Sequence, residues 1–320
     1  MDIDMPLRKI GSLSVSIVGL GCNNFGGRTD EAQSARVIFA ALDAGINFFD
    51  TADVYAGTLS EQIVGRALAN RRDEVVIATK FGMELSPQEH GAAPAYVKSA
   101  IEDSLRRLGT DYVDLYQLHK PDAATPISDT LGALAQLVTE GKVREIGCSN
   151  FSALQLQEAE QATAPGAPGF VSVQNEYSLL QREPEVEVLA ECERQALAFI
   201  PFFPLKMGLL SGKFRFGQPP PPGTRIAGMP AERQRELLGE NAMGLLQKLE
   251  DYATGRGHTL LELATGWLLA KPTVCSVISG ATRPEQVSAN AKAATWVLTP
   301  QEVAEVDAIA PPPGTGPFAP

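Results

Sequence analysis

The stretch FFDTADVYAG, residues 48–57, begins as an apolar strand and ends as a polar loop. Asp50 stands where the strand ends, and Tyr55 follows five positions later. The same order, in which a short apolar strand runs into a polar loop, recurs along the chain, so this stretch is one unit of a repeating pattern.

The repeating unit continues with a helical stretch, in which apolar residues recur at helical spacing. Strands that alternate with helices predict parallel βαβ units. Eight such units favour a (β/α)8 TIM barrel, an α/β fold, over an open doubly wound sheet. The predicted strands are 16–21, 46–50, 74–80, 113–119, 144–150, 170–176, 198–203 and 275–280, and examples of the helical segments are 31–45, 93–109, 127–142 and 183–198.

Three segments lie outside the eight units. Residues 7–16 predict an N-terminal β-hairpin before the first barrel strand. The connection between the seventh and eighth strands is extended, with a Gly/Pro loop at 217–228 and helical segments at about 231–256 and 259–271. The tail, 311–320, is predicted to be irregular. Because no linker divides the sequence, we expect a single domain over 1–320.

Charge and cysteine content narrow the class of protein. The net charge of -11 argues against nucleic acid or an anionic membrane as partner, so an anionic ligand would need a local cluster of Lys and Arg. The four cysteines are far apart and lack metal-ligand spacing, which predicts reduced thiols in a cytoplasmic protein and no metal site. The N-terminal stretch lacks the apolar segment of a secretion signal.

Ionisable side chains stand at the ends of three neighbouring predicted strands. Asp50, Lys80 and His119 end the second, third and fourth strands, and Tyr55 lies in the loop after Asp50. In a barrel these ends share one rim, where the βα loops build the active site. Each residue taken singly also fits a structural role: Asp50 as a turn cap, Tyr55 as packing, Lys80 as a solvated strand end, and His119 as a buried imidazole. Their convergence on one rim favours a catalytic group.

The chemistry of this group follows from pKa values. A phenol with a pKa near 10 is a poor acid unless its anion is stabilised, for example by an ammonium beside it. A carboxylate fixes that ammonium and keeps it charged. Asp50, Lys80 and Tyr55 therefore predict a relay that exchanges a proton with a substrate oxygen, which His119 would hold. Because no side chain supplies a hydride to the matching carbon, a nicotinamide cofactor is expected.

The usual nucleotide-binding motifs are absent from the sequence. GLGCNNFGG, residues 19–27, has Asn24 in place of the third glycine of the dinucleotide fingerprint. GLLSGKF, residues 208–214, lacks the glycine spacing of a P-loop and the Ser or Thr that follows its lysine. A different mode of cofactor binding is required.

Seven motifs, in order along the chain, resemble those of the aldo-keto reductases. They are DTADVYAG, IATKFG, YQLHKPD, REIGCSNF, VQNEYSLL, FPLKMGLLSGKF and ISGATRPEQVSAN. The resemblance is to the branch of longer bacterial reductases and potassium-channel β subunits. It implies a (β/α)8 barrel that binds NADPH, or less often NADH, in extended form.

The resemblance also implies residue roles. Tyr55 is the general acid/base, Lys80 its activator, Asp50 the partner of Lys80, and His119 the residue that orients the substrate oxygen. The matched cofactor-binding residues are Ser149, Asn150 and Gln174 for the carboxamide, Phe202 for the nicotinamide ring, Pro204, Leu205, Gly208, Leu210, Lys213 and Arg225 for the phosphates, Gly280, Thr282, Arg283, Gln286 and Asn290 for the adenosine, and Gly21, Cys22 and Asn23 opposite.

NADP(H) is the expected cofactor, because Arg283 and Arg225 suit a 2′-phosphate. NAD(H) stays open, since Ala289 and Phe203 replace residues that relatives use against the adenine and a phosphate. Phe25, Phe81, Met83 and Phe318 are apolar candidates for the substrate pocket, which suggests small aldehydes, ketones or sugars. Two other functions are considered: a cofactor-sensing subunit with little turnover, and a Schiff-base lyase that uses Lys80 as nucleophile. The oligomeric state is open.

Overall fold

The computed structural model describes residues 5–313 and contains two sheets. The smaller is an antiparallel hairpin, in which Leu7 pairs with Ser16 and Ile10 with Leu13. The larger has eight parallel strands in the order β10-β3-β4-β5-β6-β7-β8-β9. The strands are β1 (Leu7–Ile10), β2 (Leu13–Ser16), β3 (Val18–Gly21), β4 (Phe48–Asp50), β5 (Val76–Phe81), β6 (Val113–Leu118), β7 (Val143–Ser149), β8 (Ser172–Glu176), β9 (Ala198–Phe202) and β10 (Val277–Gly280).

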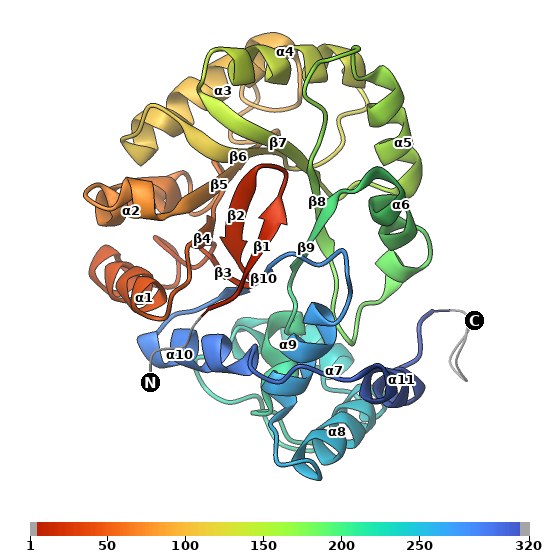
Figure 1. Cartoon of the computed structure of the whole chain (residues 1–320). Coiled ribbons are helices and arrows are strands. Elements are labelled where there is room, and N and C mark those ends of the chain that lie inside the picture. Colours follow the sequence, from red (N-terminus) through yellow and green to blue (C-terminus); the bar gives the residue numbers. More distant parts are fainter. Residues whose placement is uncertain (1–4, 314–320) are drawn as a thin grey trace.

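The eight-stranded sheet closes on itself. The N–H of Phe199 in β9 donates to the carbonyl of Thr273 at 2.8 Å, and the N–H of Cys275 donates to the carbonyl of Phe199 at 3.1 Å. These bonds join β9 to the segment that leads into β10, and helices cover the outside of the ring (Figure 1). The predicted (β/α)8 barrel with an N-terminal hairpin is therefore confirmed.

The helices follow the strands in the predicted order. Two predicted helical segments differ from the structure: 231–256 is divided after Leu237, where Gly239 precedes a new helix, and 183–198 begins with a 3-10 turn at Glu183–Glu185. The helices are α1 (Glu31–Asp43), α2 (Leu59–Leu68), α3 (Pro94–Leu108), α4 (Ile127–Thr139), α5 (Ala153–Ala162), α6 (Val188–Gln195), α7 (Ala231–Leu237), α8 (Glu240–Thr254), α9 (Leu260–Leu269), α10 (Pro284–Ala293) and α11 (Pro300–Ile309).

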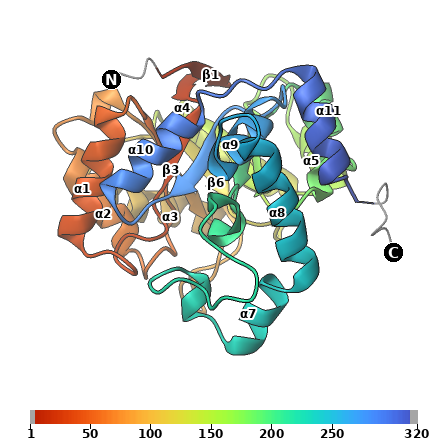
Figure 2. The same ribbon diagram turned by 90° about the horizontal axis from the view of Figure 1, so that it is seen from below.

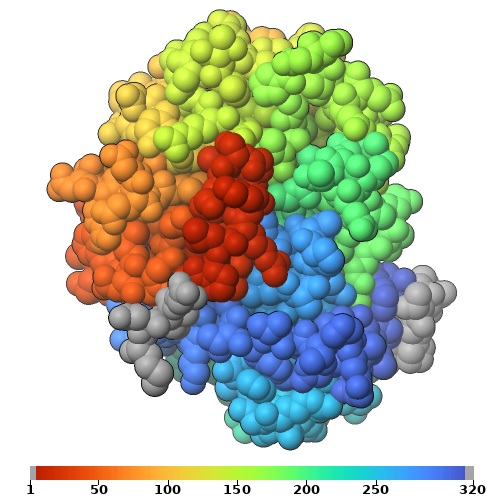
Figure 3. Space-filling view, viewed as in Figure 1, coloured from red at the N-terminus to blue at the C-terminus, as the bar shows by residue number. Residues whose placement is uncertain are grey.

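The hairpin blocks one end of the barrel. Its side chains Ile10, Leu13 and Val15 are buried in one apolar cluster with the inward-facing strand residues Phe48 and Leu115. Its residues cover the centre of the face shown in Figure 3. In the side view of Figure 2, β1 lies at one edge of the molecule and α7 at the opposite edge. The long connection between β9 and β10 thus extends past the other, open end.

Within residues 5–313, no helix has the length and apolar character needed to cross a membrane. Among the same residues, no group of His, Cys, Asp and Glu side chains is arranged to hold a metal ion. The tail residue Phe318 lies outside the described residues.

A glycine in α2 permits its close packing against α3. A Cβ atom on Gly65 would lie 2.2 Å from the carbonyl oxygen of Leu108, a backbone atom that cannot move alone. Gly132 in α4 is also helical, but a Cβ atom there would meet no other atom within 4 Å.

We predict that Gly65→Ala destabilises the fold by about 1–3 kcal/mol, because the added methyl overpacks the helix contact. The matched Gly132→Ala should be neutral or stabilise by up to ~1 kcal/mol, through its helix propensity alone. Urea unfolding of both variants measures the difference. Equal stability of the two variants would show that the α2–α3 contact tolerates a side chain.

Candidate active site

In β4, β5 and β6 the barrel interior changes from apolar to polar within two residues. Phe48, Ala78 and Leu115 point inward and pack on the hairpin cluster. Because side chains alternate between the faces of a strand, the next inward positions are Asp50, Lys80 and Gln117. The polar layer therefore lies directly above an apolar floor.

Asp50 and Lys80 form a buried ion pair across β4 and β5. The Lys80 Nζ lies 2.7 Å from Asp50 Oδ2 and donates to the carbonyl of Thr51 at 2.8 Å. Burial opposes the charge on Lys80, but the neighbouring Asp50 and Tyr55 outweigh this effect and raise its pKa. Lys80 is thus held as an ammonium that is inaccessible to solvent, with 0% of its surface exposed.

Tyr55 is brought back over this pair by its loop. Ala56, Gly57 and Thr58 have positive φ angles, which turn the chain sharply into α2. The Tyr55 hydroxyl lies 3.4 Å from Lys80 Nζ, and its ring meets His119 edge-on, with 5.9 Å between centroids. Burial raises the pKa of the Tyr55 phenol, and Lys80 acts against that shift. Tyr55 therefore stays protonated at neutral pH and can donate a proton.

His119 follows β6 at the same rim, where its backbone N–H donates to the backbone carbonyl of Phe81 at 2.8 Å. Burial lowers the pKa of the imidazole to about 3, and Lys80 and Lys120 act in the same direction. Its Nδ1 is buried without a hydrogen-bond partner in the described part of the chain. A neutral imidazole beside Tyr55 suits a hydrogen bond to an oxygen in the cavity.

Polar side chains from β7 and β8 lie next to this group. The Ser149 hydroxyl donates to the Gln174 backbone carbonyl at 2.7 Å, and Asn150 Nδ2 donates to the His119 backbone carbonyl at 2.9 Å. Gln174 Nε2 donates to Asp50 Oδ1 at 2.9 Å. The predicted carboxamide-binding residues are thus connected to the predicted proton relay.

The loop after β9 forms another wall, and its backbone is strained. Phe203, Lys206 and Met207 have left-handed φ angles of 49°, 42° and 57°, which non-glycine residues rarely adopt. The Lys206 ammonium is fixed by Glu176 at 2.7 Å and Gln181 at 2.6 Å. Strain of this kind persists where the surrounding structure enforces it, often at ligand sites.

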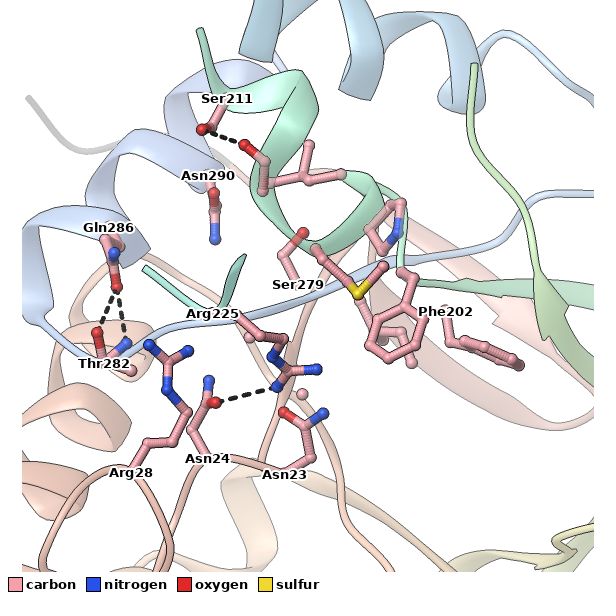
Figure 4. A pocket seen from close by; sticks show the side chains of 18 of the residues that line it. Asn23, Asn24, Arg28, Phe202, Ser211, Arg225, Ser279, Thr282, Gln286 and Asn290 are labelled. Atoms are coloured by element: carbon pink, nitrogen blue, oxygen red, sulfur yellow. Dashed lines mark hydrogen bonds between the residues drawn. The ribbon is translucent and has the colours of Figure 1, made fainter. Parts of the chain in front are cut away.

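Four cations line the cavity close to one another: Arg28, Lys213, Arg225 and Arg283. None of them pairs with a carboxylate among residues 5–313. Burial lowers the pKa of Lys213, and Arg283 and Arg28 lower it further; burial and Arg28 likewise lower the pKa of Arg225. Figure 4 shows Arg28 and Arg225 beside Asn24, which accepts a bond from Arg225 at 3.3 Å. Cations that repel one another in this way suit an anionic ligand.

Most of these groups line one cavity of about 1060 Å³. The predicted residues that line it are Gly21, Asn23, Asp50, Tyr55, Met83, His119, Ser149, Asn150, Gln174, Phe202, Pro204, Leu205, Gly208, Lys213, Arg225, Gly280, Thr282, Arg283, Gln286 and Asn290. Phe203 and Ala289, the two departures from the family pattern, line it as well.

Some predicted residues do not reach the cavity. Lys80, Cys22 and Leu210 are buried behind its wall. Phe25 and Phe81 are fully buried in the hydrophobic core, Phe81 stacked on Tyr116, so a substrate contact of either has no support in its placement. A rim aromatic that turns into the core gains more buried apolar area than one that lines an open cavity.

Several residues of this site were not predicted from the sequence. Arg28 and Asn24 line the cavity from the loop after β3, and Gln117 contacts Asp50 from β6. Gln117 could have been found from strand alternation, because it lies two positions before His119 on the same face. No pattern in the sequence indicates Arg28, whose position depends on its loop.

A closed (β/α)8 barrel with Asp, Lys, Tyr and His side chains on one rim defines an enzyme-like fold with a deep cofactor-sized cavity. The model of the Aldo/keto reductase family matches residues 17–311, and the chain belongs to this family. Its membership supports an oxidoreductase that acts on small carbonyl compounds with a nicotinamide cofactor.

Two relatives show how far the similarity extends. A rice protein (Oryza sativa subsp. japonica) named "Probable voltage-gated potassium channel subunit beta" is 33% identical over 95% of this chain and 96% of its own length. The "Aldo-keto reductase YhdN" of Bacillus subtilis (strain 168) is 33% identical over 93% of this chain and 90% of its own.

A buried carboxyl group lies behind the site. Asp53, in the loop between Asp50 and Tyr55, is 1% exposed, and neither of its oxygens has a well-formed hydrogen bond in the described residues. Burial raises the pKa of Asp53 to about 7, and Glu61 raises it further against the opposing effects of the Val54 N–H, Arg107 and Lys80.

We predict a pH-dependent effect of Asp53→Asn on stability. Because the folded pKa exceeds the unfolded value of about 4, the wild type loses stability as pH rises between about 4 and 7. Asp53→Asn should therefore gain stability relative to wild type at pH 8 compared with pH 5. Urea unfolding at both values tests this, with the exposed Asp111→Asn as control. An equal effect of Asp53→Asn at both pH values would contradict the raised pKa.

Proposed function

We propose that the protein is an NADP(H)-dependent oxidoreductase, which transfers a hydride between nicotinamide and a small carbonyl compound or its alcohol. The observation that carries the proposal is the bonded chain Asp50–Lys80–Tyr55, which opens beside His119 into the cavity that also holds the amide and cationic groups. The proton donors serve the proton transfer of such a reaction, and the anion-binding groups would hold the phosphates of the cofactor that supplies the hydride.

Tyr55 is the proposed general acid for carbonyl reduction and the general base in the reverse direction. Lys80, 3.4 Å from its hydroxyl, stabilises the phenolate that remains when the proton has left. Asp50 keeps Lys80 charged and in place. The neutral His119 donates or accepts one hydrogen bond and so orients the substrate oxygen toward Tyr55.

The cavity fits a nicotinamide dinucleotide, which supplies the hydride when bound. Ser149, Asn150 and Gln174 offer the donors and acceptors that a carboxamide needs. Phe202 offers an aromatic face for the ring. Gly21, Gly208 and Gly280 line the cavity without a side chain, so a ligand can approach the backbone there. The unpaired cations would neutralise the phosphates.

The number of cations favours NADP(H) over NAD(H). Arg28, Lys213, Arg225 and Arg283 exceed what a pyrophosphate alone requires, and the 2′-phosphate supplies the additional negative charge. Ala289 and Phe203 act against tight binding, because neither side chain forms a polar contact with the adenine or a phosphate.

The substrate class is proposed to be aldehydes, ketones or sugars without strong charge. Met83 lines the cavity near the rim and offers an apolar contact. Of the apolar candidates predicted from the sequence, Phe25 and Phe81 are buried in the core, so Met83 is the one proposed for this role. The cytoplasmic location, the single-domain organisation and the absence of macromolecular partners stay predictions.

Two other functions receive different support. A cofactor-sensing subunit with little turnover is consistent with the name of the rice relative. A Schiff-base lyase is disfavoured, because Lys80 is fully buried, charged and bound to both Asp50 and Thr51, whereas a nucleophilic lysine must be neutral and accessible.

Tyr55→Phe is expected to reduce turnover by at least 10³-fold, since it removes the proton donor, and to leave cofactor affinity nearly unchanged. The assay follows NADPH oxidation with a panel of aldehydes, ketones and sugars, and calorimetry measures NADP⁺ binding. Tyr112→Phe, on the outside of the barrel between two arginines, is the matched control. Equal turnover of both variants would refute the mechanism. Tight binding without turnover in the wild type would favour the cofactor-sensing function.

Arg283→Ala is expected to weaken NADPH binding by about 10- to 100-fold, because a charge-assisted bond to the 2′-phosphate is lost, and to change NADH binding little. Calorimetric titration of both cofactors gives the two affinities. Lys292→Ala, which removes an exposed charge from the same helix α10, should change neither. A parallel loss of NADH and NADPH affinity in Arg283→Ala would place Arg283 away from the 2′-phosphate.

A further inference from the structure

Gln117 is a fully buried amide in the middle of the polar layer. It lies on β6, in register with Lys80 of β5 on one side and Gly147 of β7 on the other. A Cβ atom on Gly147 would lie 3.4 Å from the Gln117 side chain and 2.5 Å from the Ser172 hydroxyl, so the glycine leaves room for both. The Gln117 side chain is thus enclosed between β5 and β7.

The two carboxylate oxygens of Asp50 have separate partners. Oδ2 accepts from Lys80, whereas Oδ1 accepts from Gln174 Nε2 at 2.9 Å and from Gln117 Nε2 at 3.3 Å. Gln174 Nε2 also lies 3.5 Å from Gln117 Oε1. Because an ionised carboxylate only accepts hydrogen bonds, both glutamines must turn their NH₂ groups toward Asp50.

This constraint fixes which end of the Gln174 amide is left for a ligand. Its Nε2 is directed to Asp50 and Gln117, and its Oε1 accepts no hydrogen bond within residues 5–313. Gln174 lines the cavity. The free end is therefore an acceptor, which suits the N–H of a carboxamide and repels a carboxylate at the same position.

We propose that Gln117 is a positioning residue, which donates a second bond to Asp50 Oδ1 and gives the Gln174 NH₂ group a second acceptor, so that the Gln174 Oε1 stays turned toward the nicotinamide carboxamide. The inference rests on the proposed function and adds a specificity to it: the protein distinguishes NADP⁺ from the analogue in which nicotinic acid replaces nicotinamide. Gln117 joins cofactor recognition and the proton relay in one hydrogen-bond network.

The first test is Gln117→Met, which keeps the length of the side chain and removes its amide. NADP⁺ binding should weaken by about tenfold, and the preference for NADP⁺ over its nicotinic acid analogue should fall, because Asp50 loses one donor and the Gln174 NH₂ group keeps only one of its two acceptors. Calorimetry with the two ligands measures both effects. Gln136→Met, on the exposed face of α4, is the control. Unchanged affinity and preference in Gln117→Met would overturn the proposal.

The second test is Gln117→Glu, whose behaviour depends on pH. When protonated, its carboxyl donates to Asp50 as the amide does; when ionised, it repels Asp50. NADP⁺ affinity of this variant should approach the wild-type value at pH 6 and fall at pH 8.5, whereas Gln117→Met is weak at both. A loss that is independent of pH in Gln117→Glu would indicate a packing defect and would refute the positioning role.

Different results would refute the proposed function and the role of Gln117. A wild-type protein that binds neither NADP⁺ nor its analogue refutes the proposed function itself. A wild type that binds NADP⁺, together with a Gln117→Met variant that retains its affinity and preference, refutes only the role of Gln117.

Discussion

The ion pair between Asp50 and Lys80 determines the arrangement of the barrel interior. A buried ammonium is stable only when a carboxylate and further acceptors replace its hydration, which Asp50 and the Thr51 carbonyl do here. The remaining polar groups are placed relative to this pair: Tyr55 over the ammonium, and the two glutamines on the second oxygen of the carboxylate. Loss of either ion would leave the other buried without a partner, so the pair constrains stability and chemistry together.

The cavity is electrostatically unlike the molecule that contains it. The chain has a net charge of -11, yet four cations without a carboxylate partner among residues 5–313 line the cavity: Arg28, Lys213, Arg225 and Arg283. Low-dielectric walls concentrate the field of such a cluster on whatever binds there. Burial instead dominates at the rim, where it keeps Tyr55 protonated and His119 neutral.

The fold and the catalytic candidates could be predicted from the sequence because both depend on local rules. The alternation of strands with helices and the positions of the strand ends predicted that Asp50, Lys80 and His119 share one rim. The structure brings them together with Tyr55. Arg28 could not be predicted, because its guanidinium is placed by a bond to the Gly223 carbonyl, 195 residues away in sequence. The break between α7 and α8 before Gly239 could not be predicted from the sequence either, since the residues around it fit helical spacing. The burial of Phe25 in the core was a further difference from the prediction.

The hairpin at the floor of the barrel determines how ligands reach the polar layer. With Ile10, Leu13 and Val15 sealing that end, every molecule that reaches the polar layer enters and leaves through the same mouth. Two ligands that occupy the cavity at once must therefore use the same entrance, and the ligand bound closer to the floor can leave only past the position of the other. The hairpin therefore sets the direction of entry and exit, whichever side chains at the rim select the ligand.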